Sequence, residues 1–307
     1  MAEKCVYLDD AKLWKASKHK GVIIKEYYHT HWYNGSKQGG SFKKNICVYL
    51  PYNYSEDKKY DLMVLLPGMD MPYSCYLSRA HRYSKELYSV QFQNVLDNLI
   101  DNGTIKPVVL VTLPYYGSTT EGNPVMELDG NQLIHELRED LLPYMRKKYS
   151  IAKGRKHTGI FGFSYTSTMI LKYIMPSCID LFSWFCACSV FHSDLKQAAK
   201  DLNSKLEEYP VDWLYVFCGD DDNAHDQTIE MFHTFCDRVD GIEEKSALVV
   251  FKDTGHSART YDTAIVNCLM KFFKEEKTVK EEPVKEDPVK EELKEILPCP
   301  FAEEKPE

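Results

Sequence analysis

The sequence predicts an α/β fold, with a mostly parallel sheet of about eight strands and helices on both faces. Apolar, β-branched runs alternate with helix-patterned segments along most of the chain. The later runs are almost continuously apolar, which is typical of parallel strands that helices cover on both sides. The body of the chain contains no internal repeat and no sign of a second domain.

The expected strands are apolar runs that are separated from one another by turn residues. The first two precede the most apolar part of the chain, and each later one is followed by a loop or a helix-patterned segment. In chain order they are residues 20–28, 45–51, 61–68, 107–114, 158–164, 184–190, 213–219 and 247–253.

Helix-patterned segments separate these strands. Gly103 ends the first of them and is expected to terminate the helix, because glycine accepts the left-handed conformation there. In the next one Leu133, Leu137 and Leu141 are spaced four residues apart, which places them on one face. The segments are residues 84–103, 130–149, 166–175, 224–239 and 261–273.

Size and charge exclude several classes of protein. The chain has 307 residues, 44% of them hydrophobic, which is enough for a large core. No apolar run is long enough to span a membrane, so no membrane partner is expected. The net charge of −8 comes mostly from residues 274–307, which hold seven Lys and twelve acidic residues. The remainder has no basic block suited to nucleic acid.

The C-terminal segment is expected to be a low-complexity tail. In residues 279–293 the motifs VKEEP, VKEDP and VKEEL follow one another. Pro283 and Pro288 interrupt any helix, and the apolar content is too low to offset chain entropy. We therefore expect one folded α/β domain over residues 1–273 and a charged, disordered tail over residues 274–307.

The cysteines point to buried thiols. Ten are present, and Cys47, Cys186, Cys188 and Cys218 lie inside apolar strand-like runs, where cysteine usually acts as a small hydrophobe. The sequence contains no Cys-x-x-Cys pair of the kind that binds zinc, so no metal or cofactor is expected. The charged N-terminus lacks the apolar segment of a signal peptide. As written, the chain is expected in the cytoplasm, and outside the cell if a leader has been removed.

The stretch GFSYTS, residues 162–167, resembles the Gly-x-Ser-x-Gly turn that carries a catalytic serine. Ser164 follows an apolar strand and precedes a helix, which is the context that exposes the hydroxyl above the sheet edge. The next backbone N–H, from Tyr165, can then help to hold an oxyanion. Thr166 replaces the second glycine, and its side chain is expected to strain the turn and slow the enzyme.

Two later loops carry the partners that a serine nucleophile needs, a base and an orienting carboxylate. The strand at 213–219 runs into DDDNAHD, and the strand at 247–253 runs into TGHS, where His256 follows Gly255. Serine, then acid, then histidine is the chain order in which this type of sheet places a catalytic triad. The agreement of three separate positions makes Ser164 a stronger candidate than its motif alone.

From about Lys43 to Phe273 the chain resembles the feruloyl and acetylxylan esterase branch of the α/β-hydrolases, which is related to the S-formylglutathione hydrolases. The resemblance implies the α/β-hydrolase fold and an esterase that forms an acyl-enzyme. The segments that carry it are VYLPYNYSEDKKYDLMVLLPG, FQNVLDNLIDNGTIKPVVLVTLP, LREDLLPYMRKKY, FGFSYTS, CGDDD and TGHS.

The resemblance also implies roles for individual residues. The family's Gly-x-x-Asp falls on residues 219–222, which makes Asp222 the acid, and a short loop after Gly219 would carry it across to His256. Ser164 is the nucleophile, and Met69 joins Tyr165 as an oxyanion donor. The chain departs from the family at three positions, which are Pro67 in place of histidine, Thr166 in place of glycine and Ala258 in place of tryptophan.

The implied substrates are feruloyl or acetyl esters on plant xylan. Tyr115 and Tyr116 follow the strand at 107–114 and open on the same sheet edge as Ser164, so we expect them to bind a phenolic ring or a sugar. Two alternatives stay open, a hydrolase of small soluble esters or thioesters and a catalytically weak binding protein that retains the fold. The sequence specifies neither the acyl group nor the oligomeric state.

Overall fold

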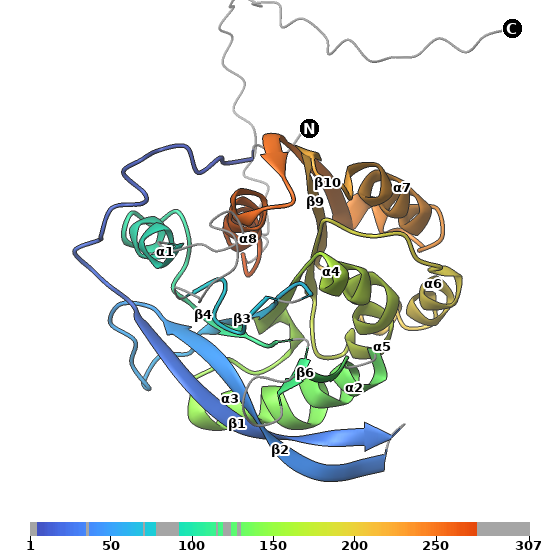
Figure 1. The fold of residues 1–307 in the computed structure, drawn as a ribbon, viewed down its shortest axis with the longest axis horizontal. Coiled ribbons are helices and arrows are strands. Elements are labelled where there is room, and N and C mark those ends of the chain that lie inside the picture. Colours follow the sequence, from blue (N-terminus) through green and yellow to red (C-terminus); the bar gives the residue numbers. More distant parts are fainter. Residues whose placement is uncertain are drawn as a thin grey trace, which may run out of the picture. The chain divides into compact units, whose positions relative to one another are not determined.

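The computed structural model describes residues 5–34, 37–69, 71–77, 92–114, 116–118, 124–127 and 130–274. Its main feature is an eight-stranded sheet in the order β1–β2–β4–β3–β7–β8–β9–β10 (Figure 1). The strands are β1 (Val22–Asn34), β2 (Lys37–Leu50), β3 (Asp61–Leu66), β4 (Val108–Thr112), β7 (Thr158–Phe163), β8 (Trp184–Cys188), β9 (Trp213–Asp221) and β10 (Ser246–Gly255).

The predicted fold class is confirmed, since each predicted strand lies in this sheet. Neighbouring strands from β4 to β10 run parallel. The pairs β1–β2 and β2–β4 are antiparallel, so the first two strands form a hairpin at one edge. A separate antiparallel pair, β5 (Tyr116–Ser118) and β6 (Pro124–Glu127), was not predicted.

Helices cover both faces of the sheet, as predicted. On one face lie α1 (Phe92–Asp101) and α8 (Ala258–Lys271), and Figure 1 shows the remaining helices on the other. Two of those helical segments contain a π-helical stretch, η1 (Glu136–Leu141) and η3 (Ile170–Ile174). The helices of the second face are α2 (Gly130–His135), α3 (Leu142–Lys148), α4 (Tyr165–Met169), α5 (Met175–Cys178), α6 (Lys196–Asn203) and α7 (His225–Cys236). Two short 3₁₀ turns are also present, η2 (Arg155–His157) and η4 (Glu243–Lys245).

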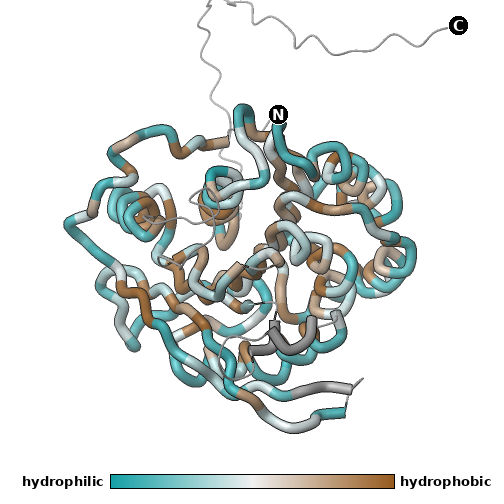
Figure 2. The backbone as a smooth tube through the Cα atoms, in the orientation of Figure 1, coloured by the Kyte–Doolittle hydropathy of each residue, from teal (hydrophilic) through white to brown (hydrophobic). Residues whose placement is uncertain are grey.

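The core has two layers because alternate residues of each strand point to opposite faces. In β3, Leu62 and Val64 join the layer under α2–α7, whereas Met63 and Leu65 join the layer under α1 and α8. Figure 2 shows these strands as mostly hydrophobic and the outer turns of the helices as hydrophilic. The predicted apolar stripe, Leu133, Leu137 and Leu141, is fully buried in the first layer.

The first predicted helix is described only from Phe92 onward, so its predicted start lies outside the described residues. Gly103 has the expected left-handed backbone, with φ of 76°. Its N–H donates to the carbonyl of Ile100 at 3.1 Å, which satisfies an acceptor at the end of α1. Helix α6 was not predicted.

A buried network of hydrogen bonds and one ion pair connects the β1–β2 hairpin to the helix α2–η1. Lys44 Nζ lies 2.8 Å from Glu136 Oε2, and both side chains are fully buried. The Tyr28 hydroxyl also donates to Glu136, and the Thr30 hydroxyl lies 2.7 Å from Asp140 Oδ2. Burial lowers the pKa of Lys44, while the Glu136 carboxylate opposes that change.

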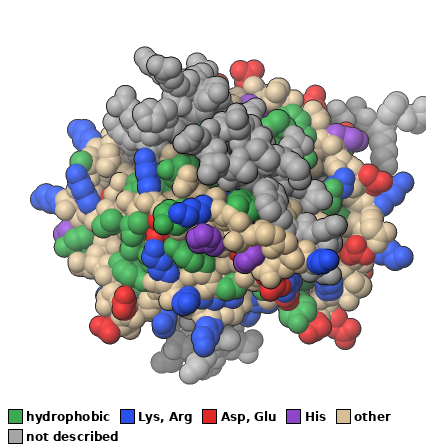
Figure 3. Space-filling model, turned by 60° about the horizontal axis from the view of Figure 1, so that its bottom comes forward, with side chains coloured by type: hydrophobic (Ala, Val, Ile, Leu, Met, Phe, Trp, Pro, Cys, Tyr) green, Lys and Arg blue, Asp and Glu red, His purple; other side chains and the backbone are tan. Residues whose placement is uncertain are grey.

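The surface of the described residues carries mixed charges. On the face shown in Figure 3, basic side chains are dispersed among acidic, polar and hydrophobic ones. Among the described helices, none is long and apolar enough to cross a membrane. All nine cysteines of the described ranges are free thiols. The chain divides into residues 1–274 and 275–307, and the second unit lies outside the described residues.

Candidate active site

Ser164 lies on a tight turn between β7 and α4, in the context that the sequence predicts. Its φ of 60° and ψ of −127° are values that residues with a side chain rarely adopt. The Ser164 N–H donates to the carbonyl of Cys188 at 2.9 Å, which ties the turn to the end of β8. Gly162 permits the turn, because a Cβ there would lie 2.6 Å from the Thr166 carbonyl oxygen.

Thr166 fits into this turn through its hydroxyl. The residue is fully buried, and Thr166 Oγ1 accepts the Phe163 N–H at 3.0 Å. The same oxygen lies 2.9 Å from the carbonyl oxygens of Leu66 and Phe163, to either of which it can donate. The sequence predicted crowding at this position. The structure shows that the Thr166 hydroxyl links the turn to the end of β3, and the predicted slowing of turnover stays a prediction.

His256 and Asp222 form a hydrogen-bonded pair on neighbouring turns. His256 Nδ1 lies 2.9 Å from Asp222 Oδ1, and the Asp222 side chain is fully buried. The register of β9 and β10 shifts between Phe251 and Gly255, immediately before His256. Asp220, in contrast, is exposed and accepts the Thr254 N–H at 3.3 Å.

The surroundings of Asp222 favour the carboxylate. Burial alone raises the pKa of Asp222, but hydrogen bonds from His256, Ser189 and the Ala224 N–H lower it more, so the pKa lies below its ordinary value. Ser189 Oγ is 2.5 Å from Oδ2, and Ala224 N is 2.8 Å from Oδ1. A charged Asp222 favours the His256 tautomer with a proton on Nδ1, which leaves Nε2 as a base.

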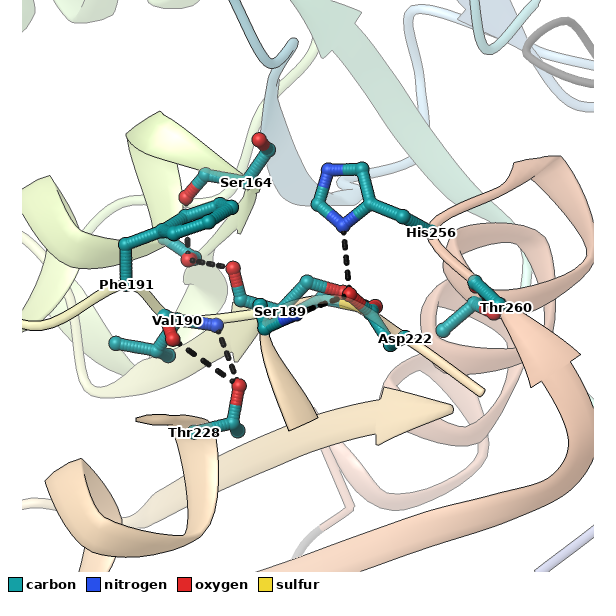
Figure 4. A network of polar contacts seen from close by, with 12 residues as sticks. Ser164, Ser189, Val190, Phe191, Asp222, Thr228, His256 and Thr260 are labelled. Atoms are coloured by element: carbon teal, nitrogen blue, oxygen red, sulfur yellow. Dashed lines mark hydrogen bonds and ion pairs between the residues drawn. The ribbon is translucent and has the colours of Figure 1, made fainter. Parts of the chain in front are cut away.

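The His256 ring lies between Asp222 and Ser164. Figure 4 shows one ring nitrogen directed at Asp222 and the other on the side of the Ser164 hydroxyl. Within this described part of the chain, no hydrogen bond joins Ser164 to His256, and such bonds often tighten only when substrate binds. The ring packs against Phe163, at 4.5 Å between centroids, and Phe191, at 5.8 Å.

The predicted oxyanion donors lie next to the same turn. A Cβ on Gly68 would be 3.0 Å from Ser164 Cβ, so the loop that follows β3 passes beside Ser164 and continues into Met69. Tyr165 is the first residue of α4, and N–H groups in the first turn of a helix point out of its N-terminus. The roles of Met69 and Tyr165 as donors stay predictions.

The predicted substrate-binding tyrosines lie at a boundary of the described residues. Tyr115 lies outside the described residues, and Tyr116 begins β5 without a described side chain. Sequence reasoning missed Ser189 and Phe191, which the structure places against Asp222 and His256. Within the described ranges, no group of three His, Cys, Asp or Glu side chains is arranged to hold a metal ion.

Residues 41–239 match the profile of the family described as Putative esterase. Over an alignment of 175 residues, which covers 54% of this chain, the sequence is 30% identical to endo-1,4-beta-xylanase Y of Acetivibrio thermocellus. That alignment covers 14% of the xylanase, so the similarity concerns a small part of a much longer protein.

Several solved structures share the fold. A feruloyl esterase module from Clostridium thermocellum, complexed with sinapinate, is 21% identical with a TM-score of 0.67 and covers 88% of this chain and 95% of that one. A ferulic acid esterase from Anaeromyces mucronatus is 20% identical, with a TM-score of 0.65 and coverage of 88% and 98%. S-formylglutathione hydrolase from Staphylococcus aureus is 14% identical, with a TM-score of 0.55 and coverage of 85% and 100%.

Proposed function

The chain belongs to the Putative esterase family, and from that premise we propose that it is a serine hydrolase of carboxylic esters on plant cell-wall polysaccharide. The esters are feruloyl or acetyl groups on xylan. One observation carries the proposal, the buried Asp222–His256 pair whose free ring nitrogen lies on the side of the Ser164 hydroxyl (Figure 4).

The proposed reaction follows from this geometry. His256 Nε2 takes the Ser164 proton as the serine oxygen attacks the ester carbonyl, and Asp222 stabilises the imidazolium that forms. The backbone N–H groups of Tyr165 and Met69 stabilise the oxyanion, a contribution that is typically worth about 3–4 kcal/mol per donor. His256 then protonates the leaving alcohol, and the acyl group stays on Ser164 until water, activated by His256, releases the acid.

The choice of substrate rests on the relatives and on the apolar side chains beside Ser164. The similar proteins include feruloyl esterases and a xylanase, whose names refer to ferulate and to xylan. Met69 and Tyr165 are 44% and 37% exposed next to the turn, and Phe191 is partly buried against His256. Such side chains offer flat or flexible apolar surfaces on which a phenolic ring can pack.

A hydrolysis panel tests the proposal. Methyl ferulate, a feruloylated xylo-oligosaccharide and acetylated xylan are compared with p-nitrophenyl butyrate, with Ser164→Ala as the blank. We expect a higher kcat/KM for at least one cell-wall ester than for the butyrate. Equal rates on all short esters would favour a hydrolase of small soluble esters. No hydrolysis of any ester would favour a binding protein that retains the fold.

A further inference from the structure

We propose that Ser189 is a positioning residue of this site, whose hydroxyl fixes the orientation and the negative charge of the Asp222 carboxylate. The effect on turnover rests on the proposed function, whereas the effect on Asp222 itself does not. Ser189 directly follows β8 and is fully buried, and Ser189 Oγ lies 2.5 Å from Asp222 Oδ2 (Figure 4).

The backbone of Ser189 adopts an uncommon conformation that aims this hydroxyl. Its φ of 61° lies in the left-handed region, which disfavours residues with a side chain. Strained residues of this kind persist where neighbours hold them, and they cluster at functional sites. At Ser189, two hydrogen bonds from backbone N–H groups hold this conformation. Its N–H donates to the Phe217 carbonyl at 2.7 Å, and the next N–H, from Val190, donates to Thr228 Oγ1 at 2.8 Å.

The same residue lies next to the turn that carries Ser164. Ser167 Oγ is 2.5 Å from the Ser164 carbonyl oxygen and 3.1 Å from the Ser189 carbonyl oxygen. The preceding residue, Cys188, accepts the Ser164 N–H. The end of β8 therefore contacts both the turn of the predicted nucleophile and the predicted acid, with Ser189 between them.

The two carboxylate oxygens of Asp222 have different partners. Oδ1 accepts hydrogen bonds from His256 and the Ala224 N–H, and Oδ2 accepts one from Ser189. Without the Ser189 hydroxyl, Oδ2 would be buried with no donor among the described residues. A buried, unpaired oxygen favours protonation and lets the carboxyl group rotate, and both changes weaken its hold on the His256 Nδ1 proton.

The direction of the pH effect follows. The ionisable groups facing Asp222 are His256 from the β10–α8 turn, Cys188 from β8 and Cys218 from β9. In the wild type the lowered pKa of Asp222 stabilises the fold above the ordinary carboxyl pKa of about 4, and this contribution is lost as pH falls. Replacing Ser189 by Ala raises that pKa. The Tm should therefore decrease by more degrees between pH 7 and pH 3 in the wild type than in Ser189→Ala.

The test compares Ser189→Ala and Ser189→Gly with Ser183→Ala. Ser183 is also fully buried, directly precedes β8, and donates to the Arg155 carbonyl at 3.2 Å, so it controls for the loss of one buried hydroxyl at the opposite end of the strand. Glycine accepts a positive φ, so Ser189→Gly removes the hydroxyl and relieves strain. It also provides a variant that folds if Ser189→Ala does not.

Three readouts are taken from the full chain: kcat and KM on the ester of the hydrolysis panel with the highest kcat/KM, the Tm from pH 7 to pH 3, and the proton resonance of His256 Nδ1–H. For both Ser189 variants we expect kcat to fall about tenfold or more with KM within about twofold, as for a lost hydrogen bond to a charged group. The pH dependence of Tm should be weaker, and the His256 resonance should move. Ser183→Ala should leave all three readouts near wild type, apart from a uniform drop in Tm.

A His256 resonance and a Tm–pH slope that are unchanged in both Ser189 variants would overturn the proposal. A shifted resonance and slope in a chain that hydrolyses no ester would uphold the link between Ser189 and Asp222. In that case only the proposed function would fall.

Discussion

Asp222 is one of three consecutive aspartates, and their environments differ enough to predict different roles. The structure pairs Asp222 with His256, whereas Asp220 is exposed and Asp221 is exposed at the end of β9. We predict that Asp222→Asn lowers kcat by about a thousandfold or more, since an amide favours the wrong His256 tautomer. Asp220→Asn, measured in the same ester assay, should stay within about threefold of wild type. If Asp220→Asn lost more activity than Asp222→Asn, Asp220 and not Asp222 would be the catalytic acid.

Thr166 is predicted to act through its hydroxyl rather than its bulk. Thr166→Val keeps the shape but leaves the Phe163 N–H without its buried acceptor, so it should lower the free energy of unfolding by about 1–3 kcal/mol. It should also lower kcat, because the turn would lose its link to β3 beside Gly68. Thr166→Ser retains the hydroxyl and is the matched control. Urea unfolding that shows equal stability for the Val and Ser variants would refute this role.

The residue-level candidates differ in how far the sequence predicts them. Ser164, Asp222 and His256 could be located because each follows an apolar strand whose end is visible in the sequence. Ser189 also follows such a strand, but a serine after an apolar run is common, and its role depends on a positive φ that no local pattern encodes. The hydrogen bonds of Thr166 were likewise invisible, because one partner, Leu66, lies a hundred residues earlier in the chain.

At the scale of elements, the strands were predictable because burial on both faces leaves continuous apolar runs. The antiparallel pairing of β1 and β2 was not specified, since it depends on how the hairpin meets β4. Helix α6, with its Lys-rich and Ala-rich sequence, lacks a wide apolar stripe and was missed. The π-helical stretches η1 and η3 interrupt otherwise regular helices that contain Pro143 and Pro176. Their sequences show the prolines but not the change in hydrogen bonding.

The link between the edge hairpin and η1 gives a prediction at this scale. Lys44→Met removes one partner of the buried ion pair and leaves the Glu136 carboxylate without its cation. We expect the free energy of unfolding to fall by about 3–5 kcal/mol, as for other broken buried pairs. Lys43→Met, on the exposed neighbouring residue whose Nζ lies 4.4 Å from the centre of the Tyr27 ring, is the control and should change stability by no more than about 1 kcal/mol. A loss in Lys44→Met as small as in the control would show that the pair does not stabilise the fold.

For the whole molecule, the charged C-terminal segment is predicted to be dispensable. Its composition cannot build a core, so a chain that ends at Glu276 should keep its Tm and its rate of ester hydrolysis. Differential scanning calorimetry and the ester assay on the full and shortened chains provide the comparison. A Tm that falls by several degrees would mean that this segment packs on the body, contrary to the prediction from composition.

This member of the Putative esterase family is predicted to use Ser164 as its nucleophile, and the proposed function depends on that role. Reaction with a serine-directed phosphonate, followed by peptide mass spectrometry, tests it most directly. We predict one label per chain, on Ser164, at a rate that falls strongly in His256→Ala, and no label in Ser164→Ala. Labelling of Ser167 or Ser257, or a wild-type chain that remains unlabelled, would contradict the account.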